Sequence, residues 1–158
     1  MKLSQELNSA LCEQLLVELG NQNKYLQIAS FFEDLQLKKL AKYFKDQSQE
    51  ENTHANKFMQ YINDRNGGKV EIGEVDNPNL KLFDINSVAD NYVTLEENTT
   101  ISIESLWDLA LTEKSYIDLP FLSEMLSIQV IEEDEAQEFA GKIKATKDLV
   151  LFDATFGG

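Results

Sequence analysis

The chain of 158 residues carries 28 Asp or Glu and 14 Lys or Arg, so its formal net charge is −14, and 42% of its residues are hydrophobic. This composition predicts one compact acidic domain over residues 1–158. Nucleic-acid binding is disfavoured because a polyanion is bound by clusters of Lys and Arg, and the acidic excess favours cations instead. Two Pro and seven Gly are few turn-forming residues for a sheet-rich fold, which needs a turn between successive strands, so long helices are expected.

The cysteine content and the N-terminal residues limit which compartment and which type of metal site can be expected. Cys12 is the single cysteine and has no intramolecular disulfide partner, and the first residues turn polar at once, unlike a signal peptide. No apolar run approaches the roughly 20 residues of a membrane helix. We therefore expect a cytoplasmic protein with no membrane contact. One Cys and one His also exclude a structural zinc site of four nitrogen and sulfur ligands, so oxygen must hold any metal.

Apolar residues recur at three-to-four spacing in four stretches, which predicts four long helices. The first runs from about Leu3 to Phe32, and the second covers residues 37–64, with Gly67 as a stop signal beyond its end. Residues 69–84 predict an extended connection, which is far longer than the usual link between neighbouring helices. Such a connection crosses the length of a bundle, so the second and third helices are expected to run parallel.

The second half of the chain predicts two further helices and a short tail. Asn86 or Ser87 is the expected N-cap of the third helix, which ends near Glu113. Asp118 is expected to cap the fourth helix, which has a proline in its first turn. The tail, residues 148–158, is apolar but too short for a full fifth helix. The fold class is therefore all-α, a four-helix bundle with a long crossover between helices two and three.

Each predicted apolar stripe is interrupted near its middle when it is followed at seven-residue spacing, which returns a side chain to within about 20° of its starting direction. The inward polar residues found in this way are Glu18, Glu51, His54, Glu96, Gln129 and Glu132. Each uncompensated buried carboxylate costs several kcal/mol, and no Lys or Arg lies on these stripes. A bound cation would supply the missing charge, and oxygen ligands with one nitrogen suit iron or manganese better than copper. Glu51 and His54 are three residues apart on one helix face and can bind the same ion.

The segments around these residues resemble bacterial-type non-haem ferritins, members of the ferritin-like di-iron carboxylate superfamily, over nearly the whole chain. The matching segments are Val17-Glu18-Leu19 followed by Tyr25, Gln49-Glu50-Glu51-Asn52-Thr53-His54, Leu95-Glu96-Glu97-Asn98 and Gln129-Val130-Ile131-Glu132-Glu133. Any one of these segments is a weak signal, whereas the combination is very specific. The resemblance implies a ferritin-like bundle in which the helices run up, down, down and up.

The resemblance also implies a function, an iron-storage subunit whose ferroxidase centre oxidises Fe(II) to Fe(III) with O2 or peroxide. In the implied di-iron centre, one iron is held by Glu18, Glu51 and His54, the second by Glu51, Glu96 and Glu132, and Gln129 and Tyr25 lie around them. Glu51 would then bridge the two ions. The ferric product would be stored as mineral inside a homo-oligomeric cage, for which the resemblance implies 24 subunits.

Three positions depart from related sites. Bacterioferritins carry a haem-ligating Met where this chain has Asn52, so no haem is expected. Many bacterial ferritins have a third iron position, formed by the Glu before the helix-two motif and by carboxylates on helix four. Glu50 is present, but Ile128 and Ile131 occupy the helix-four places. A third site at Glu50 is therefore expected to be weak or absent.

Alternatives stay open on the residues alone. A metal-sensing or scaffolding bundle could bind iron or manganese without turnover, and a structural bundle could keep its Glu side chains protonated without metal. Tyr25 is either a redox residue or a core residue that finds a hydrogen-bond partner. Glu97 and the run 133–135 are expected to face solvent, and Cys12 and Trp107 are expected to be packing residues.

Overall fold

The computed structural model describes residues 1–157, and within them it contains helices and no strand. Its helices are α1 (Gln5–Asp34), α2 (Lys38–Asp64), α3 (Ile85–Thr112), the 3-10 turn η1 (Tyr116–Asp118), α4 (Leu119–Ala145) and α5 (Leu149–Thr155). The all-α prediction is thus confirmed. None of the helices in this part of the chain has both the length and the apolar content that crossing a bilayer requires.

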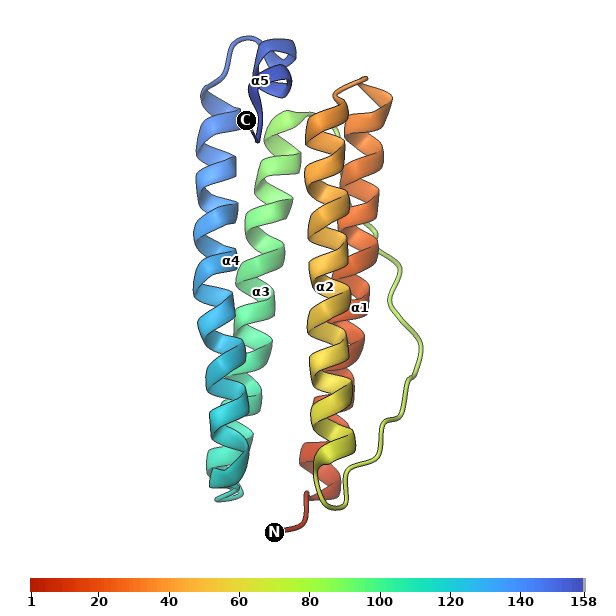
Figure 1. Ribbon diagram of the computed structural model, residues 1–158, viewed down its shortest axis with the longest axis vertical. Helices are drawn as coiled ribbons and strands as arrows, with labels where there is room; N and C mark the ends of the chain where they lie inside the picture. The colour runs from red at the N-terminus through yellow and green to blue at the C-terminus, as the bar shows by residue number, and fades with distance from the viewer. Residues whose placement is uncertain (158) are drawn as a thin grey trace.

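The four long helices form one bundle in which α1 runs up, α2 and α3 run down, and α4 runs up (Figure 1). The connection between α2 and α3 travels the length of the bundle beside α1. Contacts fix it there, since Asn8 Nδ2 donates to the carbonyl oxygen of Lys69 at 2.9 Å. The predicted long crossover and the parallel pair of middle helices are therefore confirmed.

Side chains at the helix starts set the boundaries, and they correct the predicted starts of α1 and α3. Ser4 caps α1 by accepting a hydrogen bond from Leu7 N at 3.0 Å, so this helix begins two residues after the expected Leu3. The cap of α3 is Asp84, not Asn86 or Ser87. Ser87 is instead the third helical residue, and its hydroxyl accepts from Asp84 N while Asp84 accepts from Ser87 N. This reciprocal pair satisfies two free donors at once and therefore starts the helix earlier.

Asp118 precedes α4 as expected, but its carboxylate does not cap that helix. It accepts hydrogen bonds from Arg65 Nε at 2.5 Å, from Ser115 Oγ at 2.6 Å and from the Tyr61 hydroxyl. Burial raises the pKa of Asp118, but the bonds from Arg65, Ser115 and Tyr61 outweigh it and hold the pKa below its usual value. The carboxylate thereby joins the end of α2 to the start of α4.

The C-terminal tail folds back on the bundle as the seven-residue α5. Leu37, which precedes α2, offers no side-chain cap, and Asp153 Oδ1 from α5 accepts from Leu40 N at 2.9 Å in its place. The ring of Phe156 packs edge-on against Tyr43, with ring centroids 5.1 Å apart. The tail is short of a full fifth helix, as expected, and it closes one end of the bundle.

A layer of polar side chains divides the apolar core into two clusters. The first cluster is built around Tyr25, Phe32, Phe44, Tyr92 and Phe139, and the second around Leu7, Leu15, Phe58, Ile103 and Leu122. The buried polar residues include Glu18, Asn21, Glu51, His54, Glu96, Thr99, Gln129 and Glu132. All four long helices contribute to this layer, so the bundle holds these groups from every side.

We expect Asp118→Asn to lower the free energy of unfolding by about 3 kcal/mol, because it leaves the partly buried Arg65 without its counter-charge. The ionised carboxylate stabilises the fold above the ordinary Asp pKa of about 3.9, and this contribution is lost as the pH falls through the lower folded-state pKa. Urea unfolding of both proteins at about pH 7 and pH 3 measures the difference. Asp108→Asn, at an exposed position of α3, is the matched control. Equal stability of the two variants at pH 7 would contradict the prediction.

Candidate metal centre

Each predicted inward residue of the polar layer is buried in the middle of a helix. Glu18 comes from α1, Glu51 and His54 from α2, Glu96 from α3, and Gln129 and Glu132 from α4. None of their exposed fractions exceeds 6%. Seven-residue spacing therefore found the inward face of every helix. Glu97 is exposed, as expected for a residue about 100° further round α3.

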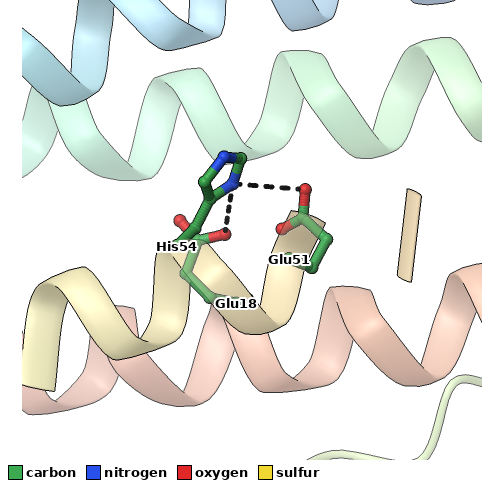
Figure 2. Close-up of side chains that lie close together, drawn as sticks. All are labelled: Glu18, Glu51 and His54. Carbon is green, nitrogen blue, oxygen red and sulfur yellow. Dashed lines mark ion pairs between the residues drawn. The ribbon is translucent and has the colours of Figure 1, made fainter. Parts of the chain in front are cut away.

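Glu18, Glu51 and His54 form the tightest group of potential ligands. Figure 2 shows their side chains converging, with Glu18 approaching from α1 and the other two from α2. His54 Nδ1 lies 3.5 Å from Glu51 Oε1 and 4.0 Å from Glu18 Oε2. One ligand atom from each residue lies within 4.8 Å of the other two. A single cation can therefore contact all three.

Glu96 and Glu132 extend the polar layer onto α3 and α4. Glu132 Oε1 lies 3.8 Å from His54 Nε2. Glu96 is held by the Tyr25 hydroxyl, which donates to Glu96 Oε1, and by Gln129 Nε2, which donates to Glu96 Oε2 at 3.2 Å. Tyr25 and Gln129 thus orient a carboxylate in this structure.

Three polar residues of the layer were not identified from the sequence. Gln14 Nε2 donates to Glu18 Oε1 at 3.2 Å. Asn21 Nδ2 lies 3.5 Å from Glu51 Oε2 and donates to Thr99 Oγ1 at 2.8 Å. The series 14, 21, 28 reads Gln, Asn, Ile and would have shown Gln14 and Asn21 as polar positions beside the Glu18 stripe.

Four atoms of the layer are buried without any hydrogen-bond partner: Glu18 Oε2, Glu51 Oε1, His54 Nδ1 and Glu132 Oε2. Such orphaned atoms are rare in proteins because burying an unpaired polar group is costly. Three of them belong to the group that converges on one point, and each can donate a lone pair to a metal. The donor set of carboxylate oxygens and one imidazole therefore fits a cation such as Fe(II) or Mn(II).

The electrostatics of the layer favour the same conclusion. Burial, and next the charge of Glu51, raise the pKa of Glu18 well above its usual value. Burial also raises the pKa of Glu51 to about 8, and the charges of Glu96 and Glu132 add to this effect. No Lys or Arg is among the buried polar residues of the described chain. A divalent cation would restore the carboxylates to their ionised form, because it supplies the charge that the protein lacks.

Comparison with known proteins identifies the family. The ferritin-like domain family matches residues 8–146. The chain belongs to this family. It is 31% identical over 150 residues to a bacterial non-heme ferritin of Bacteroides fragilis, covering 95% of this chain and 94% of that protein. A bacterial non-heme ferritin of Staphylococcus saprophyticus is 31% identical over 131 residues, covering 83% of this chain and 78% of its own length.

A solved structure agrees with the sequence relatives. An open pore ferritin of the archaeon Archaeoglobus fulgidus superposes with a TM-score of 0.90 at 28% identity, over 96% of this chain and 94% of that one. The ferritin-like bundle inferred from the sequence is therefore confirmed, and the relatives and the structure match over nearly the same length.

Glu50 lies at the edge of this ferritin-like bundle and is exposed. Burial raises the pKa of Glu132 to about 9, and the charge of Glu50 is among the further causes, so the two side chains are close. Ile131, at one of the helix-four places noted above, is 60% exposed. The charge of Glu50 therefore acts on Glu132, while Ile131 offers no carboxylate beside them, and a weak or absent third site stays a prediction.

We expect the metal-free protein to lose stability as the pH rises from about 5 to about 8. The unfolded chain ionises its Glu side chains near pKa 4.3, whereas burial raises the folded-state pKa of Glu96 to about 7 and that of Glu51 to about 8. The folded state then binds more protons than the unfolded state in this window, so stability falls with pH. Thermal unfolding in chelator measures the fall, and added Zn²⁺ should reverse it.

The matched control for this prediction is Glu51→Gln, which keeps the shape of the side chain and removes its titration. Its melting temperature in chelator should fall less between the two pH values than that of the wild type. A metal-free wild-type protein whose stability is constant across this window would contradict the prediction.

Proposed function

We propose that this ferritin-like chain is an iron-storage subunit whose polar layer is a ferroxidase centre that oxidises Fe(II) to Fe(III). The observation that carries the proposal is the set of orphaned ligand atoms, Glu18 Oε2, Glu51 Oε1, His54 Nδ1 and Glu132 Oε2, in a buried layer without a protein cation. Carboxylate-rich donors of this kind suit iron and manganese. The membership of the ferritin-like family favours iron.

The geometry supports an assignment of ligands for two substrate ions. Glu18 and His54 would bind one Fe(II), and Glu96 and Glu132 would bind the other. Glu51 is the candidate bridge, because its Oε1 lies 3.5 Å from His54 Nδ1 and the charges of Glu96 and Glu132 also act on it. No haem ligand is needed in this scheme, since all the oxidation chemistry takes place on the two ions.

The protein's contribution is to hold both ions in place and to favour the oxidised state. Each Fe(II) gives up one electron to O2 or peroxide, so two adjacent ions supply two electrons. Anionic ligands stabilise Fe(III) more than Fe(II), because the Coulomb attraction grows with the charge of the ion. Gln14, Asn21 and Gln129 hold the carboxylates through amide hydrogen bonds, which limits the reorganisation needed when the charge changes.

Storage requires an assembly that encloses the product. We propose a homo-oligomeric cage of 24 subunits in the cytoplasm, supported by the full-length similarity to ferritins. The net charge of −14 would attract Fe(II) to such a shell and favour the deposition of ferric mineral on it. A bundle that only binds iron or manganese, as a sensor or scaffold without turnover, is the alternative that the same ligand set permits.

We expect Glu51→Ala and His54→Ala to abolish rapid Fe(II) oxidation, because each removes a ligand and Glu51 would serve both ions. Oxygen uptake after addition of Fe(II) at about pH 7 measures the rate. Glu104→Ala, an exposed Glu on α3, should oxidise iron as the wild type does. Equal rates in all four proteins would refute the ferroxidase. Iron binding without oxygen uptake in the wild type would establish the non-turnover alternative.

We expect the protein to form particles far larger than its 18.0 kDa chain, since a mineral cannot be held by a single bundle. Light scattering coupled to size-exclusion chromatography measures the mass, and electron microscopy after iron loading shows whether the particle is hollow and filled. A stable monomer under both conditions would remove the storage part of the proposal and leave the oxidation chemistry intact.

A further inference from the structure

The two proposed ion positions differ in how many of their ligand atoms are free. At the first position, Glu18 Oε2, Glu51 Oε1 and His54 Nδ1 are buried and have no hydrogen-bond partner in the described chain. At the second position, Glu132 Oε2 is likewise free, but both oxygens of Glu96 accept hydrogen bonds from neighbouring side chains. The first ion therefore finds its ligand atoms ready, whereas the second must compete with hydrogen bonds for its ligands.

Asn21 contacts the other oxygen of the candidate bridge. Its Nδ2 lies 3.5 Å from Glu51 Oε2, the oxygen that the second ion would share. Asn21 is 2% exposed and Glu51 is 1% exposed, so bulk water does not compete for this contact. A hydrogen bond of this length is weak, and a metal ion can therefore compete with it. The amide is thus placed to hold Glu51 Oε2 without blocking it.

Thr99 decides which way round the Asn21 amide lies. The two ends of an asparagine amide are alike in shape, so hydrogen-bond partners set its orientation. The Thr99 hydroxyl donates its hydrogen to the carbonyl oxygen of Leu95 at 2.9 Å. Its oxygen lies 2.8 Å from Asn21 Nδ2 and, because its hydrogen is already used, can only accept a hydrogen bond there. The Asn21 amide therefore presents its N–H groups, and not its oxygen, to Thr99 and to Glu51.

We propose that Asn21, oriented by Thr99, is a positioning residue that turns Glu51 toward the first ion and makes the second ion compete with the amide for Glu51 Oε2. The inference rests on the proposed two-ion centre. With Oε2 held by Asn21, Glu51 Oε1 stays beside His54 Nδ1, where the first ion needs it. The second ion shares Oε2 only at the expense of a hydrogen bond to a charged group. The pair formed by Asn21 and Thr99 thereby sets the difference in affinity between the two binding steps.

The test titrates the metal-free protein with Co²⁺, a divalent ion whose visible absorption reports binding without any oxidation of iron. In the wild type we expect two Co²⁺ ions per chain to bind in two resolved steps. Asn21→Leu keeps the approximate size of the side chain and removes the N–H donor, which frees Glu51 Oε2 for the second ion and loosens Oε1 at the first. The ratio of the second dissociation constant to the first should therefore fall roughly tenfold. Asn23→Leu, at an exposed position of the same helix, is the matched control and should keep the wild-type ratio.

Two variants of Thr99 separate the orientation of the amide from the packing of the core. Thr99→Val has nearly the same shape but no hydroxyl, so the amide loses the acceptor that fixes it and can turn its oxygen toward Glu51. The ratio of the two constants should fall as it does in Asn21→Leu. Thr99→Ser retains the hydroxyl and should keep the wild-type ratio. A residue that only packs the core would show the reverse order, because serine loses the methyl group while valine keeps the volume.

Melting temperatures give a second readout that does not depend on the titration. The hydrogen bond from Asn21 to Glu51 is intact in the metal-free protein and is weakened once the second ion shares Oε2. Asn21→Leu should therefore lower the melting temperature more in chelator than in saturating Co²⁺, each measured against the wild type under the same condition. An asparagine with a purely structural role would lower both melting temperatures equally.

The outcomes distinguish this inference from the proposed function. Wild-type protein that binds fewer than two Co²⁺ ions per chain overturns the two-ion centre, and the role of Asn21 with it. Two bound ions with the same ratio of constants in the wild type and Asn21→Leu overturn the role of Asn21 alone. A wild-type ratio in Thr99→Val overturns the orientation of the amide by Thr99. If Asn21→Leu does not fold, the same ratio in Thr99→Val and Thr99→Ser decides the question.

Discussion

The structure depends on a concentration of negative charge that the protein does not neutralise by itself. Glu18, Glu51, Glu96 and Glu132 lie in one buried layer, and the only basic side chain among them is His54. In two of these carboxylates, one oxygen is hydrogen-bonded and the other has no partner. Gln14 occupies one oxygen of Glu18 and leaves the other without a partner. Asn21 does the same for Glu51. The amides thus fix Glu18 and Glu51 through one oxygen each and keep the second oxygen of each available, an arrangement suited to metal ligation.

The rest of the bundle is arranged so that this layer can persist. Apolar clusters lie on both sides of it along the bundle axis, so the hydrophobic free energy comes from positions that need no metal. The two ends are fastened by polar contacts of other kinds. Asp118 joins α2 to α4 at one end, and Asp153 caps α2 from the tail at the other. These contacts lie at a distance from the layer, so the apolar clusters and the polar contacts at the two ends stabilise the bundle independently of any ligand of the layer.

Helical periodicity explains why much of this was predictable. Glu18 and Glu132 were identified because a long helix returns a side chain to the same face every seven residues, whatever its neighbours do. Asp84 was not identified as a cap, because Asn86 and Ser87 have equal intrinsic preference for that position and only the reciprocal bonds with Ser87 decide it. Contacts between helices are still harder to predict from the sequence. The bond between Tyr43 and Tyr92 joins residues 49 apart, and nothing in either segment indicates the partner.

The two sides of the polar layer differ in their access to solvent. On the α1 and α3 side, Asn21 and Thr99 are buried and bonded to each other, which closes that route. On the α2 and α4 side, the charge of Glu50 acts on Glu132, and Glu50 lines a surface cavity between these two helices. With Ile131 at this place on α4, the next acid that acts on Glu50 is Glu135, one turn further along the helix and in the lining of the same cavity. The accessible negative charge on this side therefore lies in the cavity, beside the buried layer rather than within it.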